Sequence, residues 1–183
     1  LIDKVRYEDA LTLIPHAEAM APTPQKRREI QLRRISALTE LGKEELAINA
    51  LNSFIEENPD TPETMTAEFK LARLLRETGN YVLASEHFDT VANAEGAPGQ
   101  LRYQAAIARG WSFMDAEEFE KAVEAFSTSA KLGQTREEQA RAYFLAGDAA
   151  LRQDSHTRAA MFYQNIADNF AGTPYAEEAR FKQ

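Results

Sequence analysis

The chain has 183 residues, of which 44% are hydrophobic and 27% charged, a balance typical of globular proteins and not of disordered ones. Lysine and arginine number 21 against 29 aspartate and glutamate residues, and the net charge of −8 argues against nucleic acid or an anionic membrane surface as a partner. The chain has no cysteine, which excludes disulfides, thiol nucleophiles and thiolate metal sites.

The first segment with helical periodicity runs from Tyr7 to Pro22, and Pro15 inside it is expected to kink or shorten the helix. From about Arg28 onward the pattern predicts pairs of helices. The first helix of a pair stops at a turn, as at Gly79 in ETGNY, and the second ends near Pro or Gly, as in NPDTP. No apolar run approaches the roughly 18 residues of a membrane-spanning helix, so we expect no membrane insertion.

An internal repeat of 37 or 38 residues relates these segments to one another. Its most regular column is an alanine, found at Ala10, Ala47, Ala84, Ala122 and Ala159. Four residues later comes a large apolar residue, in turn Ile14, Leu51, Phe88, Phe126 and Tyr163. Twelve residues before the last four alanines come mostly small residues, Ile35, Ala72, Gly110 and Gly147. We expect the small residues to let the two helices of a unit approach closely, and the aromatic residues to fill the space between successive units.

The segments LGKEELAINAL, TGNYVLASEHF, AEEFEKAVEAF and DSHTRAAMFYQ each carry the alanine and the large residue, and together they resemble the tetratricopeptide repeat family. The resemblance covers essentially the whole chain and implies an all-α, right-handed α-solenoid of helix-turn-helix repeats with a period of about 37 residues. It divides a single solenoid, residues 1–183, into a half repeat (1–24), four repeats (about 28–64, 65–102, 103–139 and 140–176) and the start of another (177–183).

The chain departs from the usual family pattern early in the first helix of each repeat. A Trp or Tyr is usual there, whereas this chain has Gln31, Glu68 and Ala106, and only Tyr143 matches. The period also exceeds the usual period of about 34 residues, with Pro-rich turns between repeats. In this respect the chain is similar to bacterial cell-envelope members, the periplasmic Tol–Pal-associated coordinator and the lipoprotein of outer-membrane β-barrel assembly. That similarity implies a periplasmic or envelope location, with the cytoplasm as the alternative.

The residues that usually carry chemistry form no recognisable motif in this chain. His16, His87 and His156 occupy different positions in different repeats, so they give weak support to a metal site. Acidic neighbours such as Glu117 and Glu118 suit a solvated helix face better than acid–base catalysis. We therefore expect no enzyme activity, no metal and no cofactor.

The family resemblance also implies that the first helices line a concave groove. Residues at fifteen, eleven and eight positions before each alanine tend to face that groove, and a neighbouring arginine adds to them. The candidates are Leu32, Ser36, Phe69, Arg73, Arg76, Ile107, Trp111, Met114, Arg141, Phe144, Asp148 and Leu151. An aligned apolar stripe with Trp111 and arginines beside it is typical of an interaction hot spot, and the alternative is that these side chains only fill the interior of the superhelix.

These observations predict a non-enzymatic scaffold that binds a partner peptide or helix in its concave groove. The clamp that chaperone-binding relatives use for a peptide carboxylate is not reproduced, because Leu32, Ser36, Phe69 and Arg73 stand at its positions. Two alternatives remain open. The chain is either an architectural, self-associating spacer, which would make it a homo-oligomer, or a regulatory region of a larger enzyme or transporter. It begins at Leu1 and ends within an expected helix, so we expect it to be a piece of a longer protein.

Overall fold

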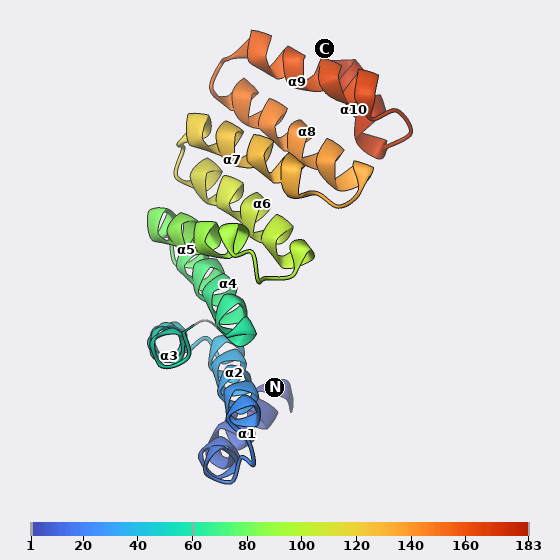
Figure 1. The fold of residues 1–183 in the computed structure, drawn as a ribbon. Helices are drawn as coiled ribbons and strands as arrows, with labels where there is room; N and C mark the ends of the chain where they lie inside the picture. The colour runs from blue at the N-terminus through green and yellow to red at the C-terminus, as the bar shows by residue number, and fades with distance from the viewer. Residues whose placement is uncertain (1, 60, 183) are drawn as a thin grey trace. The chain divides into compact units, whose positions relative to one another are not determined.

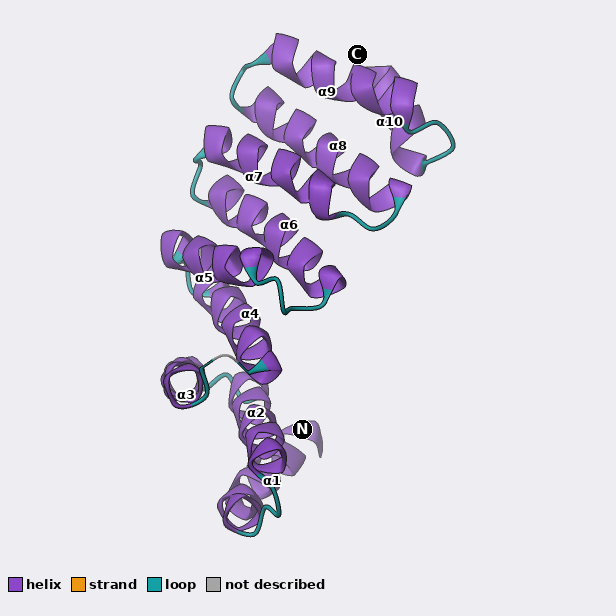
Figure 2. Ribbon diagram, viewed as in Figure 1, coloured by secondary structure: helices purple, strands orange, loops and turns teal. Residues whose placement is uncertain are grey.

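The structure of the protein is a computed structural model that describes residues 2–59 and 61–182. Residues 1, 60 and 183, which fall within the predicted repeats, lie outside the described residues. In the two described ranges the chain is helical, with loops between helices and no strand (Figure 1, Figure 2). The helices are α1 (Ile2–Ala19), α2 (Pro24–Glu40), α3 (Glu44–Glu57), α4 (Pro62–Glu77), α5 (Tyr81–Asn93), α6 (Gly99–Asp115), α7 (Phe119–Leu132), α8 (Arg136–Arg152), α9 (His156–Asn169) and α10 (Pro174–Lys182).

The chain forms two compact units, Leu1–Leu74 and Leu75–Gln183. In the first unit α2 packs against α1 and α3, and α1 continues past Pro15 to Ala19, so this proline does not end the helix. In the second unit each helix from α6 to α9 packs against the helices before and after it, and α10 packs against both α8 and α9 (Figure 1). The organisation of residues 1–183 as a single domain stays a prediction.

The predicted fold class and period are confirmed. The second helices of the repeats begin at Glu44, Tyr81, Phe119 and His156, in steps of 37, 38 and 37 residues. The first helices begin three or four residues before the predicted repeat boundaries. Proline opens several of them, at Pro24, Pro62 and Pro174, because the first helical position needs no backbone N–H donor. We call α2 with α3 hairpin 1, α6 with α7 hairpin 3, and α8 with α9 hairpin 4.

The same turn closes the first helix in every repeat and depends on one residue in the left-handed region. That residue is Gly42, Gly79, Glu117 or Asp154, with φ of 68°, 85°, 58° and 60°. The next backbone N–H then donates to the carbonyl five residues earlier, for example Lys43 to Leu38 at 2.9 Å. Glycine adopts this conformation at no steric cost, whereas Glu117 and Asp154 carry a penalty of about 1–2 kcal/mol each. The left-handed backbone conformation is therefore imposed by the packing of the two helices, and the turn does not require glycine.

A small residue facing an aromatic ring lies at the centre of hairpins 3 and 4. The ring of Phe126 lies directly on Gly110, where any Cβ would overlap it, and a Cβ at Gly147 would lie 2.6 Å from the ring of Tyr163. Both aromatic side chains are buried, at 1% and 0% exposed. Each ring lies against the small residue of its own hairpin, where only glycine leaves room for it. That the rings also fill the space between successive units stays a prediction.

This close contact predicts that Gly110→Ala destabilises the second unit even though alanine is the better helix former. The added methyl forces the ring of Phe126 to move, an overpacking cost of about 1–3 kcal/mol, against a helix-propensity gain of up to about 1 kcal/mol. We expect a net loss of about 1–2 kcal/mol in urea unfolding followed by the fluorescence of Trp111, the single tryptophan of the chain.

The matched control is Gly96→Ala, since nothing lies within 4 Å of a Cβ at that position. In the background of Phe126→Leu, which has no ring to displace, Gly110→Ala should cost measurably less than in the wild type. Equal costs in both backgrounds would contradict the contact.

Candidate interaction surface

The predicted groove residues of the first unit lie on α2 and α4. Leu32 and Phe69 are half-buried and Arg73 is exposed. The hydroxyl of Ser36 donates to the carbonyl of Leu32 at 3.0 Å and is in turn 2.9 Å from Nζ of Lys70, on the following first helix. Burial lowers the pKa of Lys70, and the nearby charge of Arg73 lowers it further. This part of the predicted groove therefore combines two half-buried apolar side chains with a polar contact between Ser36 and Lys70.

Two apolar candidates of the second unit, Ile107 and Phe144, are buried in the core, at 7% and 6% exposed. The ring of Phe144 packs against Tyr163 and Tyr175, each with centroids 5.6 Å apart, and Nζ of Lys182 lies 4.4 Å from its centroid. Tyr175 and Lys182 both belong to α10, so the next first helix covers this position. Sequence offsets placed these two side chains on an open face, whereas the structure buries them.

The remaining apolar candidates of the second unit keep part of their surface exposed. Trp111, Met114 and Leu151 are half-buried and pack against the core. The indole of Trp111 meets the ring of Phe126 edge-on, with centroids 5.6 Å apart and an interplanar angle of 77°. Edge-to-face contacts of this kind fix an aromatic side chain. Trp111 is thus held in place while part of its surface remains available.

The charged candidates of the second unit fall into two groups. Arg76 is bound to Asp115, with Nε and Oδ2 2.6 Å apart, and Oδ1 of Asp148 accepts from Tyr163 at 2.6 Å and from Lys182 at 2.7 Å. Arg141 is exposed and lies beside the phenol of Tyr103, with which it interacts. Ser36 and Asp148 occupy the same position of the repeat, and each meets a lysine 34 residues further on.

Lys182 takes part in these contacts and was not among the candidates from the sequence, which also gave Tyr163 only as a packing residue. The signal for Lys182 is present, because Lys70 stands at the same position of the repeat. The burial of Tyr163 together with its bond to Asp148 raises the pKa of the phenol above its usual range.

The side chains in the described part of the chain offer no centre for metal chemistry. They contain no group of three His, Asp or Glu side chains that could hold a metal ion. None of the described helices is long and apolar enough to cross a membrane. Trp111, Met114, Leu151 and Arg141 are exposed to different degrees and provide contact area on this surface.

A tetratricopeptide repeat model matches residues 32–99 and 107–174. The chain belongs to the tetratricopeptide repeat family. Repeats of this family generally mediate protein–protein interactions, scaffolds of the family are generally non-enzymatic, and no catalytic family is indicated for this chain. No curated protein matches the chain in sequence.

Several solved structures share this repeat fold at low sequence identity. Tetratricopeptide-like repeats of a kinesin light chain from Podosopora anserina are 14% identical, with a TM-score of 0.68 over 98% of this chain and 90% of that one. MamA from RS-1 is 20% identical, with a TM-score of 0.66 over 100% and 89% of the two chains. PlcR from Bacillus thuringiensis, in complex with the peptide PapR7 and DNA, is 13% identical, with a TM-score of 0.58 over 91% of this chain and 66% of PlcR. At these identities the likeness shows the fold alone.

A buried tyrosine beside Arg141 predicts how the second unit responds to alkaline pH. Tyr103 is 2% exposed and donates to the carbonyl of Glu138 at 3.0 Å. Burial raises the pKa of Tyr103 to about 12, although Arg141 acts in the opposite direction. Between about pH 10 and 12 the unfolded chain loses this proton while the folded chain keeps it, so the free energy of unfolding falls as the pH rises. We expect Tyr103→Phe to show a shallower fall over this range than the wild type in chemical unfolding, and parallel profiles would contradict the assignment.

Proposed function

We propose that the chain is a scaffold that binds a partner peptide or helix along its first helices, in the region of Trp111, Met114, Leu151 and Arg141. Membership of a family of interaction repeats supports this proposal, and so does the chemistry of the surface. The observation that carries it is Trp111, since a tryptophan fixed by an edge contact with Phe126 and still partly exposed has the character of a binding hot spot.

The chemistry of the surface also suggests what the partner looks like. Trp111, Met114 and Leu151 favour apolar anchors, and the exposed guanidinium of Arg141 favours an acidic residue beside them. PlcR, which has a similar fold, was solved in complex with the peptide PapR7, so a peptide partner has a precedent among proteins of this architecture. The DNA in that complex has no counterpart in our proposal, because this chain carries a net charge of −8.

The proposal extends to location: the chain acts in a bacterial envelope assembly, in the periplasm or at the cell envelope. The long period and the Pro-rich turns before α4 and α10 support this reading through their similarity to envelope members of the family. The alternatives are an architectural, self-associating spacer and a regulatory region of a larger enzyme or transporter.

Affinity capture with four baits tests the proposal. The baits are the wild type, Trp111→Ala, Met114→Glu and Met161→Glu, incubated separately with soluble and envelope fractions of bacterial lysate and compared by quantitative mass spectrometry. Met161 is the matched control, because it is an exposed methionine of α9 that lies outside the proposed surface. We expect one envelope protein to bind the wild type and Met161→Glu, and to bind the other two baits about tenfold less or weaker, as for loss of a hot spot.

Each other outcome removes a defined part of the proposal. If circular dichroism shows that the variants remain helical, equal capture by all four baits would contradict the assignment of the binding surface. A partner found in the soluble fraction alone would contradict the envelope location. Capture of the chain by itself, lost on dilution, would support the architectural alternative in place of partner binding.

A further inference from the structure

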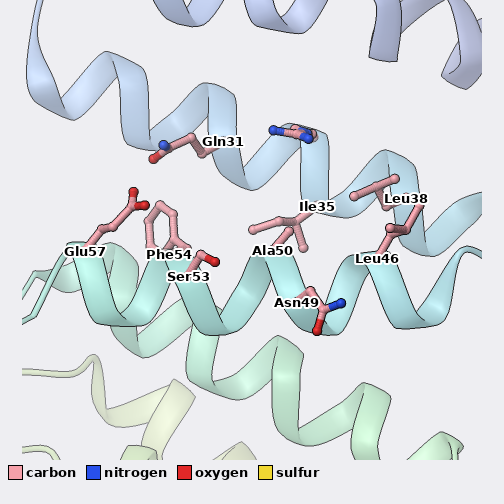
Figure 3. Close-up of a pocket in the computed structure, with 10 residues that line it drawn as sticks. Gln31, Ile35, Leu38, Leu46, Asn49, Ala50, Ser53, Phe54 and Glu57 are labelled. Atoms are coloured by element: carbon pink, nitrogen blue, oxygen red, sulfur yellow. The ribbon is translucent and has the colours of Figure 1, made fainter.

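A groove of about 340 Å³ lies between α2 and α3 in the first unit (Figure 3). Its apolar lining consists of Ile35, Leu38, Leu46, Ala50 and Phe54. Ile35 and Phe54 are buried, whereas Leu46 is 56% exposed and lies with Leu38 at one end of the groove. None of the interaction candidates from the sequence lines it. The groove is thus a hollow in hairpin 1 with an exposed apolar side chain at its rim.

Comparison with hairpin 4 shows which side chains this groove lacks. Gln31 and Ala50 stand at the repeat positions that Tyr143 and Phe162 occupy in hairpin 4. There the two half-buried rings stack with centroids 6.3 Å apart. Hairpin 1 has no ring at either position, so the side of the hairpin that stacked rings cover in hairpin 4 stays open.

Small side chains alone do not open the groove, because hairpin 3 has Ala106 and Ala125 at the same two positions and both are buried. The difference lies at the contact between the helices, where hairpin 3 has Gly110 and hairpin 1 has Ile35. A buried isoleucine occupies volume that glycine leaves to the facing helix, so it holds α2 and α3 apart. The groove is therefore a consequence of how the core of hairpin 1 is packed.

The two walls of the groove carry opposite charges. The α2 wall belongs to a helix with five basic and two acidic residues, whereas α3 has four glutamates and no basic residue. Among the lining residues, Arg34 stands on α2 and Glu57 on α3. Arg27 lies seven residues before Arg34 and therefore on the same face of α2. The groove has no net excess of either sign, but its charges are divided between the walls.

The charges along the two walls have no partners within the chain. Arg27 and Arg34 on α2 are exposed, as are Glu56 and Glu57 on α3, and none of the four forms an ion pair with a described residue. An occupant that contacts both walls must therefore present acidic groups to α2 and basic groups to α3. A second copy of the chain presents this combination on the same two helices.

A two-fold axis that runs along the groove brings two copies together with opposite charges in contact. Such an axis exchanges the walls, so α2 of each copy lies over α3 of the other. It also preserves the ends, so Leu46 of one copy meets the Leu38 end of the other, and Glu57 meets the Gln31 end (Figure 3). An axis across the groove would instead place α2 over α2, with arginines against arginines, which is unfavourable.

We infer that the chain forms a two-fold dimer through hairpin 1, in which the grooves of two copies face each other. The α2 and α3 helices of both copies then enclose one apolar centre, and the arginines of each α2 pair with the glutamates of the other α3. Five of the ten lining residues are polar or charged, which suits a reversible association better than a permanent one.

Sedimentation velocity over a range of concentrations tests the dimer on the full 183-residue chain. The wild type should shift from monomer to dimer as the concentration rises. Leu46→Glu should raise the dissociation constant about tenfold or more, because it places a carboxylate at the apolar end of the contact. Leu13→Glu is the matched control and should leave the dimer unchanged, since Leu13 is an exposed leucine of α1 that does not line the groove.

An exchange of charges identifies the two walls as the contact. One variant carries Arg27→Glu with Arg34→Glu, and the other carries Glu56→Arg with Glu57→Arg. Each variant alone has two walls of one sign, so it should be monomeric at concentrations where the wild type is dimeric. An equimolar mixture should form a dimer with one copy of each, which also shows that both variants are folded. Arg33→Glu should have a much smaller effect, since Arg33 is exposed on α2 but does not line the groove.

The inference is overturned if the wild type stays monomeric at all concentrations, if the mixed charge variants stay monomeric, or if Leu13→Glu and Leu46→Glu weaken the dimer equally. It is also overturned if the wild type is monomeric and a different protein occupies the groove. Trp111→Ala should leave the dimer intact and Leu46→Glu should leave partner capture intact, which separates this inference from the function proposed above. A chain that dimerises and also captures a partner satisfies both.

Discussion

The closeness of the two helices in each hairpin depends on one pair of positions, twelve residues before the repeat alanine and four residues after it. In hairpins 3 and 4 the pairs are Gly110 with Phe126 and Gly147 with Tyr163, and a single added methyl would overlap the ring. Protein interiors are packed as densely as organic crystals, so volume at one position must be balanced at the other. Hairpin 1 has Ile35 and Leu51 instead, a larger residue on the first helix and a smaller one on the second.

This constraint relates the stability of the repeats to the surfaces they offer. Where glycine lets the helices approach, the neighbouring positions hold buried small side chains in hairpin 3 and half-buried, stacked aromatic rings in hairpin 4. Where isoleucine stands, a groove remains between α2 and α3. Successive first helices are joined in a second way, by lysines that reach the preceding first helix at Ser36 and Asp148. The surface available to partners is therefore the part that is covered neither by packing within a hairpin nor by the lysine contacts between successive first helices.

The sequence predicted the fold in detail because repetition supplied independent observations of the same pattern. Second helices begin at the predicted spacing of 37 or 38 residues, and the family and fold class are confirmed. The candidate surface was harder to predict. Ile107 and Phe144 have the right offset but are buried, and Phe144 is covered by α10, a helix of the following repeat. The left-handed turn residues Glu117 and Asp154 carry no glycine signal. The groove of hairpin 1 was visible only as a missing aromatic at Gln31, and its cause, Ile35, needed the packing of the other hairpins for comparison.

A measurement of the distance between α2 and α3 tests most directly whether the residue at position 35 determines the spacing of the two helices. Because the chain has no cysteine, spin labels at Arg33→Cys and Asn52→Cys, both exposed positions, report the distance between the two helices by double electron–electron resonance. The comparison is between the native pair and Ile35→Gly with Leu51→Phe, which reproduces the pair of hairpin 3. The account predicts a shorter distance in the variant with helical content retained. An unchanged distance in a folded variant would contradict it.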